Sequence, residues 1–202
     1  MEYLRDPAAI YSRSFEIIRA ETDFSALPAD AADVAIRIIH ACGMTGVTRE
    51  LRITDNFCAA ARGVLEADRP VLADVEMVRQ GIIAKTPNVL CFIADPRTSQ
   101  IALREKTTRS AAAVQLWLPH LEGALVVIGN APTALYALLE AIDEGSPRPA
   151  AIAAFPVGFV GAAESKDELV RNPRGIPFAT LLGRKGGSAM AAATVNALRP
   201  QT

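Results

Sequence analysis

The chain of 202 residues lacks the sequence signatures of several common site chemistries. Its three cysteines are widely spaced and form no C-x-x-C pair, which argues against a zinc site and favours free thiols in a reducing compartment. No G-x-G-x-x-G follows the first predicted strand, and neither a P-loop nor a G-x-S-x-G nucleophile elbow occurs. We therefore expect a site without a metal, a nucleotide or another cofactor.

A strong charge of either sign is also missing. The chain carries 21 Lys and Arg against 22 Asp and Glu, which argues against a general nucleic-acid binder. The first residues lack the basic and then apolar pattern of a secretory signal, so we expect a cytoplasmic protein. The uncharged run 123–139 contains Asn130 and Pro132, and we interpret it as a strand, a turn and a helix rather than a membrane span.

Half of the residues are hydrophobic, and short apolar runs alternate with helical segments along most of the chain. The predicted strands span residues 50–53, 70–73, 88–93, 124–128, 150–155 and 178–182. The predicted helices span residues 7–20, 28–41, 56–66, 75–83, 96–118 with a break near 106–108, 132–142, 166–171 and 188–198. Apolar strands between helices are typical of a parallel sheet that is buried on both faces. We predict one doubly wound α/β domain over residues 1–202, with a mainly parallel sheet and two N-terminal helices.

Single residues predict some of the helix ends. Asp6 before Pro7 is typical of a helix start, and Asp55 is a plausible cap for the helix at 56–66. Gly43 is a plausible stop for the second helix.

The segment from Arg37 to Gly43 carries His40, one of only two histidines in the chain. Histidine titrates near neutral pH, so His40 could give and take protons. Arg37 lies about one helical turn earlier on the same face, where it could anchor an anion. A structural histidine that caps the last carbonyls of its helix is the alternative.

Ligands of doubly wound folds gather beyond the carboxyl ends of the strands. Here that rule selects the loops that follow Ala73, Ile128, Phe155 and Leu182. The second of these loops runs from Gly129 to a helix that begins at Pro132, whose free amides could face an anion; an ordinary strand–turn–helix junction is the alternative. After the first, Asp74 and Glu76 could do acid–base work, but we favour a solvated helix start.

The other two loops carry cations. Residues 156–166 form a long, apolar, glycine-rich loop that could wrap a flat apolar ligand while Lys166 pairs with a carboxylate; a buried structural loop is the alternative. In the loop after Leu182, Arg184 and Lys185 stand between glycines ahead of a helix, which suits acidic groups. These features together indicate a large, flat, polyacidic ligand whose reaction needs only proton transfer.

In these segments the chain resembles the precorrin-8X methylmutase family, isomerases of the cobalamin pathway. The resemblance runs nearly end to end. It rests on residues 10–15, Arg37 with 40–43, 74–78, 108–112, 129–135, 156–166, and Gly183 with 186–188. It implies a flavodoxin-like three-layer fold, a homodimer with sites near the subunit interface, and a cofactor-free reaction.

The resemblance also implies the chemistry. The family moves a methyl group from C-11 to C-12 of precorrin-8X to give hydrogenobyrinic acid, or acts on the cobalt-containing equivalent. The family histidine falls on His40, which would be the proton donor or acceptor, and family substrate contacts fall on Ser14 and Arg37. Residue type and loop position extend the expected substrate contacts to Arg109, Asn130, Thr133, Lys166 and Arg184.

Two other functions remain open at this point. The same loops would serve a carrier that binds a tetrapyrrole without converting it. A generic α/β domain that binds another small polyanion would show no preference for macrocycles.

Overall fold

The computed structural model describes residues 1, 3–83 and 88–199. Within these residues six strands form one sheet, in the order β1-β6-β5-β4-β2-β3. They are β1 (Leu51–Ile53), β2 (Val71–Ala73), β3 (Val89–Cys91), β4 (Leu125–Ile128), β5 (Ala151–Ala154) and β6 (Phe178–Leu181). The pairs are parallel except that β1 runs antiparallel to β6. The five parallel strands have the 2-1-3-4-5 order of flavodoxin-like folds, so the predicted mainly parallel α/β fold is confirmed.

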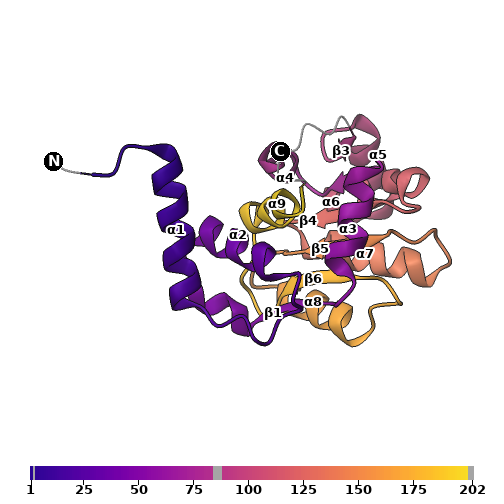
Figure 1. Cartoon of the computed structure of the whole chain (residues 1–202). Coiled ribbons are helices and arrows are strands. Elements are labelled where there is room, and N and C mark those ends of the chain that lie inside the picture. Colours follow the sequence, from indigo (N-terminus) through magenta and orange to yellow (C-terminus); the bar gives the residue numbers. More distant parts are fainter. Residues whose placement is uncertain (2, 84–87, 200–202) are drawn as a thin grey trace.

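Helices cover both faces of the sheet and make it the middle of three layers (Figure 1). They are α1 (Pro7–Glu21), α2 (Ala32–Cys42), α3 (Phe57–Glu66), α4 (Glu76–Gly81), α5 (Pro96–Glu105), α6 (Arg109–Trp117), α7 (Pro132–Asp143), α8 (Ala162–Arg171) and α9 (Ser188–Ala197). Alternate strand residues face opposite layers. In β2, Val71 and Ala73 belong to the core under α2, α3, α4 and α9, whereas Leu72 belongs to the core under α6, α7 and α8.

The start of α1 and the end of α2 lie where side-chain chemistry predicts, whereas α2 begins at Ala32 rather than near residue 28. The Asp6 carboxylate accepts the N–H of Ala9 at 2.9 Å and caps α1, which begins at Pro7. Gly43 ends α2 in the left-handed conformation, with φ 69°, and donates its N–H to the carbonyl of Ile39 at 2.7 Å. Helix α1 stands apart from the three layers and packs chiefly against α2 (Figure 1).

The predicted break in the long helical region is also confirmed. Helix α5 ends before Lys106, whose φ is 52°, and the Thr108 hydroxyl caps α6 by accepting the N–H of Ala111 at 3.1 Å. The uncharged run 123–139 folds as β4, a turn and α7, as predicted. No helix of the described residues is long and apolar enough to cross a membrane.

Three local expectations need correction. Asp55 does not cap α3, because the chain turns at Thr54, whose carbonyl accepts the N–H of Phe57 at 3.0 Å. Helix α8 begins four residues before the predicted start, directly after Gly161 in the left-handed conformation. A 3-10 helix, η1 (Thr45–Arg49), joins α2 to β1, and a second, η2 (Leu118–His120), follows α6; neither was predicted.

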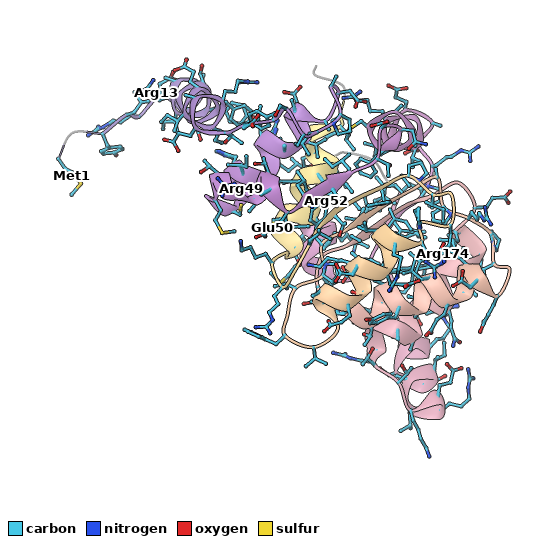
Figure 2. The ribbon with its side chains drawn as sticks, turned by 90° about the horizontal axis from the view of Figure 1, so that it is seen from below. Met1, Arg13, Arg49, Glu50, Arg52 and Arg174 are labelled. Carbon is cyan, nitrogen blue, oxygen red and sulfur yellow. The ribbon has the colours of Figure 1, made fainter. Side chains whose placement is uncertain are left out.

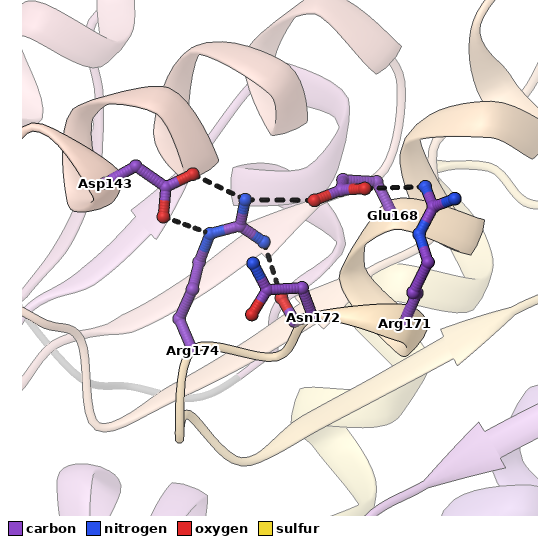
Figure 3. Close-up of polar contacts among 5 residues, drawn as sticks. All are labelled: Asp143, Glu168, Arg171, Asn172 and Arg174. Atoms are coloured by element: carbon purple, nitrogen blue, oxygen red, sulfur yellow. Dashed lines mark hydrogen bonds and ion pairs between the residues drawn. The ribbon is translucent and has the colours of Figure 1, made fainter.

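An arginine cluster fixes the connection from α8 to β6 (Figure 3). The Arg174 guanidinium donates to Asp143 at the end of α7, at 2.6 and 2.8 Å, and to Glu168 on α8 at 3.1 Å. Glu168 also accepts from Arg171 at 2.6 Å. Only 8% of the Arg174 side chain is exposed, so these ion pairs are less screened than typical surface pairs. The cluster ties α8 to α7 and fixes the helix that carries Lys166.

Candidate active site

His40 lies in the last turn of α2, and its exposed ring is held by a hydroxyl from α1. Ser14 Oγ lies 2.9 Å from Nδ1 of His40. In the described part of the chain, no hydrogen bond engages Nε2 of this ring. A hydrogen bond at one ring nitrogen fixes the orientation of the ring and of its other nitrogen. The arrangement therefore presents Nε2 to a ligand.

Two aromatic side chains surround this pair. Tyr11 and Phe15 meet the His40 ring edge-on, with ring centroids 5.8 and 5.5 Å away. The Arg37 guanidinium carbon lies 5.1 Å from the centroid of Tyr11 and 5.6 Å from that of Phe15. Tyr11 and Phe15 are one turn apart on α1 and enclose the position of Ser14, which is the spacing that could have predicted this group.

Tyr11 and Phe15 were noted only as part of the family resemblance, so their contact with the histidine is a finding of the structure. By contrast, the structure brings together Ser14, Arg37 and His40, which were predicted as site residues. We call these five residues the histidine group: Tyr11, Ser14, Phe15, Arg37 and His40.

The hollow beside the histidine group is small. It measures about 210 Å³ and is lined by residues of α1, the end of α2 and Thr45. Sites for drug-sized ligands measure roughly 300–1,000 Å³. A hollow of about 690 Å³ lies between α6 and α7, but Glu105, Glu140 and Glu144 line it, and these carboxylates would repel a polyacidic ligand. Among the described residues of one copy, the hollow at His40 is thus smaller than a typical site for a drug-sized ligand.

Asp74 is buried, which corrects the expectation of a solvated helix start. Only 1% of the residue is exposed, and its carboxylate accepts the backbone N–H groups of Gly129, Asn130 and Ala131 at 2.9–3.0 Å. Burial raises the pKa of the Asp74 carboxyl, and these hydrogen bonds oppose the rise. The backbone N–H groups directly before α7 thus bind an internal carboxylate.

This loop occupies the switch point of the sheet, where β2 and β4 are neighbours and their connections leave in opposite directions. Thr133, in the first turn of α7, shares a 2.8 Å hydrogen bond with Thr108, the cap of α6. Arg109 begins α6, and both Arg109 and Asn130 are exposed. The structure thus brings two predicted loops together, but no hydrogen bond or ion pair among the described residues joins them to the histidine group.

Lys166 is placed differently from its predicted role. The residue is fully buried, and its ammonium donates to the carbonyls of Pro156 at 3.0 Å and Lys185 at 2.6 Å. Burial lowers the pKa of Lys166 to about 8. Arg184 is exposed and lies over the ring of Phe159, 5.2 Å from its centroid. In this conformation a ligand carboxylate can reach Arg184, whereas Lys166 is bonded to backbone carbonyls inside the protein.

Comparison with known proteins decides between the classes of function. The model of the precorrin-8X methylmutase family matches residues 9–200. The chain belongs to this family. It is 52% identical to the precorrin-8X methylmutase of Sinorhizobium sp, over 98% of this chain and 96% of that protein. It is 48% identical to the precorrin-8X methylmutase of Pseudomonas aeruginosa, over 98% and 97%.

More distant relatives agree with this family. The cobalt-precorrin-8 methylmutase of Priestia megaterium is 33% identical over 95% of this chain and 87% of that protein. The crystal structure of a precorrin-8X methylmutase from Thermus thermophilus superposes with a TM-score of 0.83 at 33% identity, over 95% of this chain and 94% of that one. As a member of this family, the chain is an isomerase of cobalamin biosynthesis.

The described residues also contain no group of three or more His, Cys, Asp or Glu side chains that could hold a metal ion. Cys58 is buried, and Cys42 and Cys91 are half-buried; all three are free thiols. Burial raises the pKa of Cys58 and of Cys91 to about 11, so neither thiol is suited to nucleophilic chemistry near neutral pH.

Proposed function

We propose that this isomerase moves the methyl group from C-11 to C-12 of precorrin-8X, giving hydrogenobyrinic acid, with His40 as the proton donor or acceptor. The observation that carries the proposal is the 2.9 Å hydrogen bond between Ser14 and His40, on an exposed helix end beside Arg37. General acid–base catalysis by a positioned histidine is worth about 10²–10⁴-fold in rate. Family membership supports the reaction class.

The reaction is an isomerisation, so protons and electrons balance without a partner. The bond from the methyl group to C-11 breaks as the bond to C-12 forms. His40 gives a proton to the macrocycle to favour the reactive tautomer and recovers one afterwards. Ser14 fixes the ring, and Arg37 binds a carboxylate side chain of the substrate, with Arg109, Asn130, Thr133 and Arg184 as further contacts.

We propose cobalt-free precorrin-8X rather than the cobalt form as the substrate. The relatives at 48–52% identity are named precorrin-8X methylmutases, whereas the cobalt-precorrin-8 methylmutases that match are 32–38% identical. A competition between the two substrates tests this choice, and a higher kcat/KM for the cobalt form would contradict it.

We also propose that a second copy of the chain completes the site. The hollow at His40 is too small for a macrocycle, and α1 stands apart from the body of the protein (Figure 1). This helix carries exposed apolar side chains. Ile10 is 45% exposed and Ile17 is 41% exposed. A homodimer that covers α1 would bury these side chains and enlarge the site. The free thiols fit a reducing cytoplasm.

An anaerobic incubation with precorrin-8X tests the function. The methyl shift extends the conjugation of the macrocycle, so the absorption spectrum should change with time for the wild-type protein. His40→Ala should still bind the macrocycle, as followed by titration of its absorption, but should lose turnover. Binding without conversion of either substrate form by the wild-type protein would favour a tetrapyrrole carrier.

A further inference from the structure

A buried ammonium group without an acidic partner lies beneath two surface loops. Lys166 is 0% exposed, and among the described residues no carboxylate lies within ion-pair distance of its nitrogen. Two carbonyls, those of Pro156 and Lys185, accept its hydrogen bonds. Burying a charge without a counter-ion is unfavourable, so a lysine here costs stability that a neutral side chain would not. Core packing alone therefore does not explain a lysine at this position.

The two carbonyls belong to different loops, which we call the paired loops: residues 155–161 and residues 182–187. Backbone hydrogen bonds also join the two loops. The Gly158 N–H donates to the carbonyl of Arg184 at 3.2 Å, and the Gly187 N–H donates to the carbonyl of Phe155 at 2.8 Å. They approach so closely at Gly186 that a Cβ there would collide with the carbonyl of Phe155. Lys166 is thus the side chain that ties the paired loops to α8 from below.

The paired loops present an apolar surface with a cation beside it. Phe159 and Val160 are 83% and 89% exposed, and the Arg184 guanidinium rests on the Phe159 ring. Lys185 is held aside by an ion pair with Glu50 at 3.1 Å. A flat apolar group next to an arginine suits a flat macrocycle that carries carboxylate side chains.

The paired loops adjoin the part of the chain that leads back to His40. Leu182 donates its N–H to the carbonyl of Glu50 at 2.9 Å, and Glu50 follows η1, which begins three residues after the end of α2. Figure 2 shows Glu50 between Arg49 and Arg52 at this edge of the molecule. Exposed Arg49 and Arg52 add positive charge to it, which attracts a polyacidic substrate.

We propose that Lys166 is a positioning residue of the substrate site. It holds the paired loops so that Phe159 stacks on the macrocycle and Arg184 binds one of its carboxylates. The inference rests on the proposed function. It replaces the predicted direct contact between Lys166 and the ligand with an indirect one through the carbonyls of Pro156 and Lys185. It requires that the effects of Lys166 and Arg184 on substrate binding depend on each other.

A double-mutant cycle on KM tests this dependence. Arg184→Gln should raise KM for precorrin-8X about tenfold and leave the melting temperature unchanged, because the side chain is exposed. Lys166→Met should raise KM by a similar factor with a smaller change in kcat. In the double variant the two factors should not multiply, since Arg184 is already misplaced without Lys166. Arg104→Gln on α5 is the matched control for loss of a surface arginine.

Each result separates the possible explanations. Multiplicative effects of Lys166→Met and Arg184→Gln, or an unchanged KM for Arg184→Gln, would overturn the inference. If Lys166→Met does not fold, Lys166→Arg and Phe159→Ala replace it: Lys166→Arg should retain a KM near that of the wild type, and Phe159→Ala should raise it. Lack of turnover by the wild-type protein would instead contradict the proposed function. The double-mutant cycle would then be measured on the dissociation constant of the macrocycle rather than on KM.

Discussion

At the scale of single residues, the histidine group depends on a hydrogen bond between two helices. Ser14 on α1 and His40 on α2 are 26 positions apart, and their 2.9 Å contact fixes the histidine ring at an exposed helix end. The sequence predicted His40 and Arg37 through residue type and helical spacing, and the family resemblance added Ser14 and supported the other two. It did not predict that Tyr11 and Phe15 would enclose the ring, because that depends on how α1 packs on α2.

Ser14→Ala should lower kcat about fivefold, since a hydrogen bond of this kind contributes about 1 kcal/mol and its loss leaves the ring free to rotate. The change should leave KM and the melting temperature close to the wild-type values. Steady-state kinetics at several pH values measure it, with Ser12→Ala on the same helix as the control. A kcat equal to that of the wild type would show that Ser14 does not orient His40.

Lys166 should give the free energy of unfolding a distinct pH dependence. Its pKa is about 8 in the folded protein and returns to about 10.5 on unfolding, so between these values the unfolded chain binds more protons at this position. The Lys166 contribution to the free energy of unfolding therefore rises as the pH rises from 8 to 10. Urea denaturation should show that the free energy of unfolding of the wild type rises relative to that of Lys166→Met over this range. A wild type that gains no stability relative to Lys166→Met as the pH rises would contradict the buried, uncompensated charge.

At the scale of elements, sequence reasoning succeeded where structure is local. The cap at Asp6, the stop at Gly43 and the break before Thr108 each depend on contacts within four residues along the chain. It failed at Asp74 and Lys166, whose partners lie 55–57 and 10–19 residues away. Both are charged residues beside helix starts, which normally indicates exposure, and only the packing of the sheet ends shows that both are buried.

The conformation of the loop between β4 and α7 should depend strongly on its hydrogen bonds to Asp74. Asp74→Ala leaves three N–H groups, two of them buried, without their acceptor, and each buried group costs about 1–3 kcal/mol, so the free energy of unfolding should fall by about 2 kcal/mol or more. Glu76→Gln, which breaks only a partly exposed ion pair with Arg79, should change it by less than about 1 kcal/mol. Chemical denaturation measures both. A loss below about 1 kcal/mol for Asp74→Ala would contradict the anchoring role.

At the scale of the whole molecule, the site is distributed. The flavodoxin-like order was implied by the resemblance, and the general rule for such folds places ligands at the switch point between β2 and β4. Here Asp74 occupies that position, and the histidine group sits on the added N-terminal helices. Elements β1 and α1 were both predicted, but the antiparallel direction of β1 and the position of α1 apart from the three layers were not, because these depend on tertiary packing rather than on local patterns.

Introducing negative charge on the exposed face of α1 should dissociate the proposed dimer into monomers. Ile10→Asp with Ile17→Asp places two carboxylates on apolar positions that a second copy would cover. Sedimentation should then show a monomer with a native circular dichroism spectrum and greatly reduced turnover. Leu103→Asp, at an 83% exposed apolar position on α5, is the control and should stay dimeric. A double variant that remains dimeric and active would contradict the role of α1.

The most direct test of the account follows the methyl group itself. Precorrin-8X carrying ¹³C in the C-11 methyl group would be incubated anaerobically with the wild-type protein and with His40→Ala, and the product would be examined by NMR. We predict that the wild type transfers the label to C-12 and that His40→Ala binds the substrate but leaves the label on C-11. Label that stays on C-11 with the wild type, or moves at the wild-type rate without His40, would contradict the central claim.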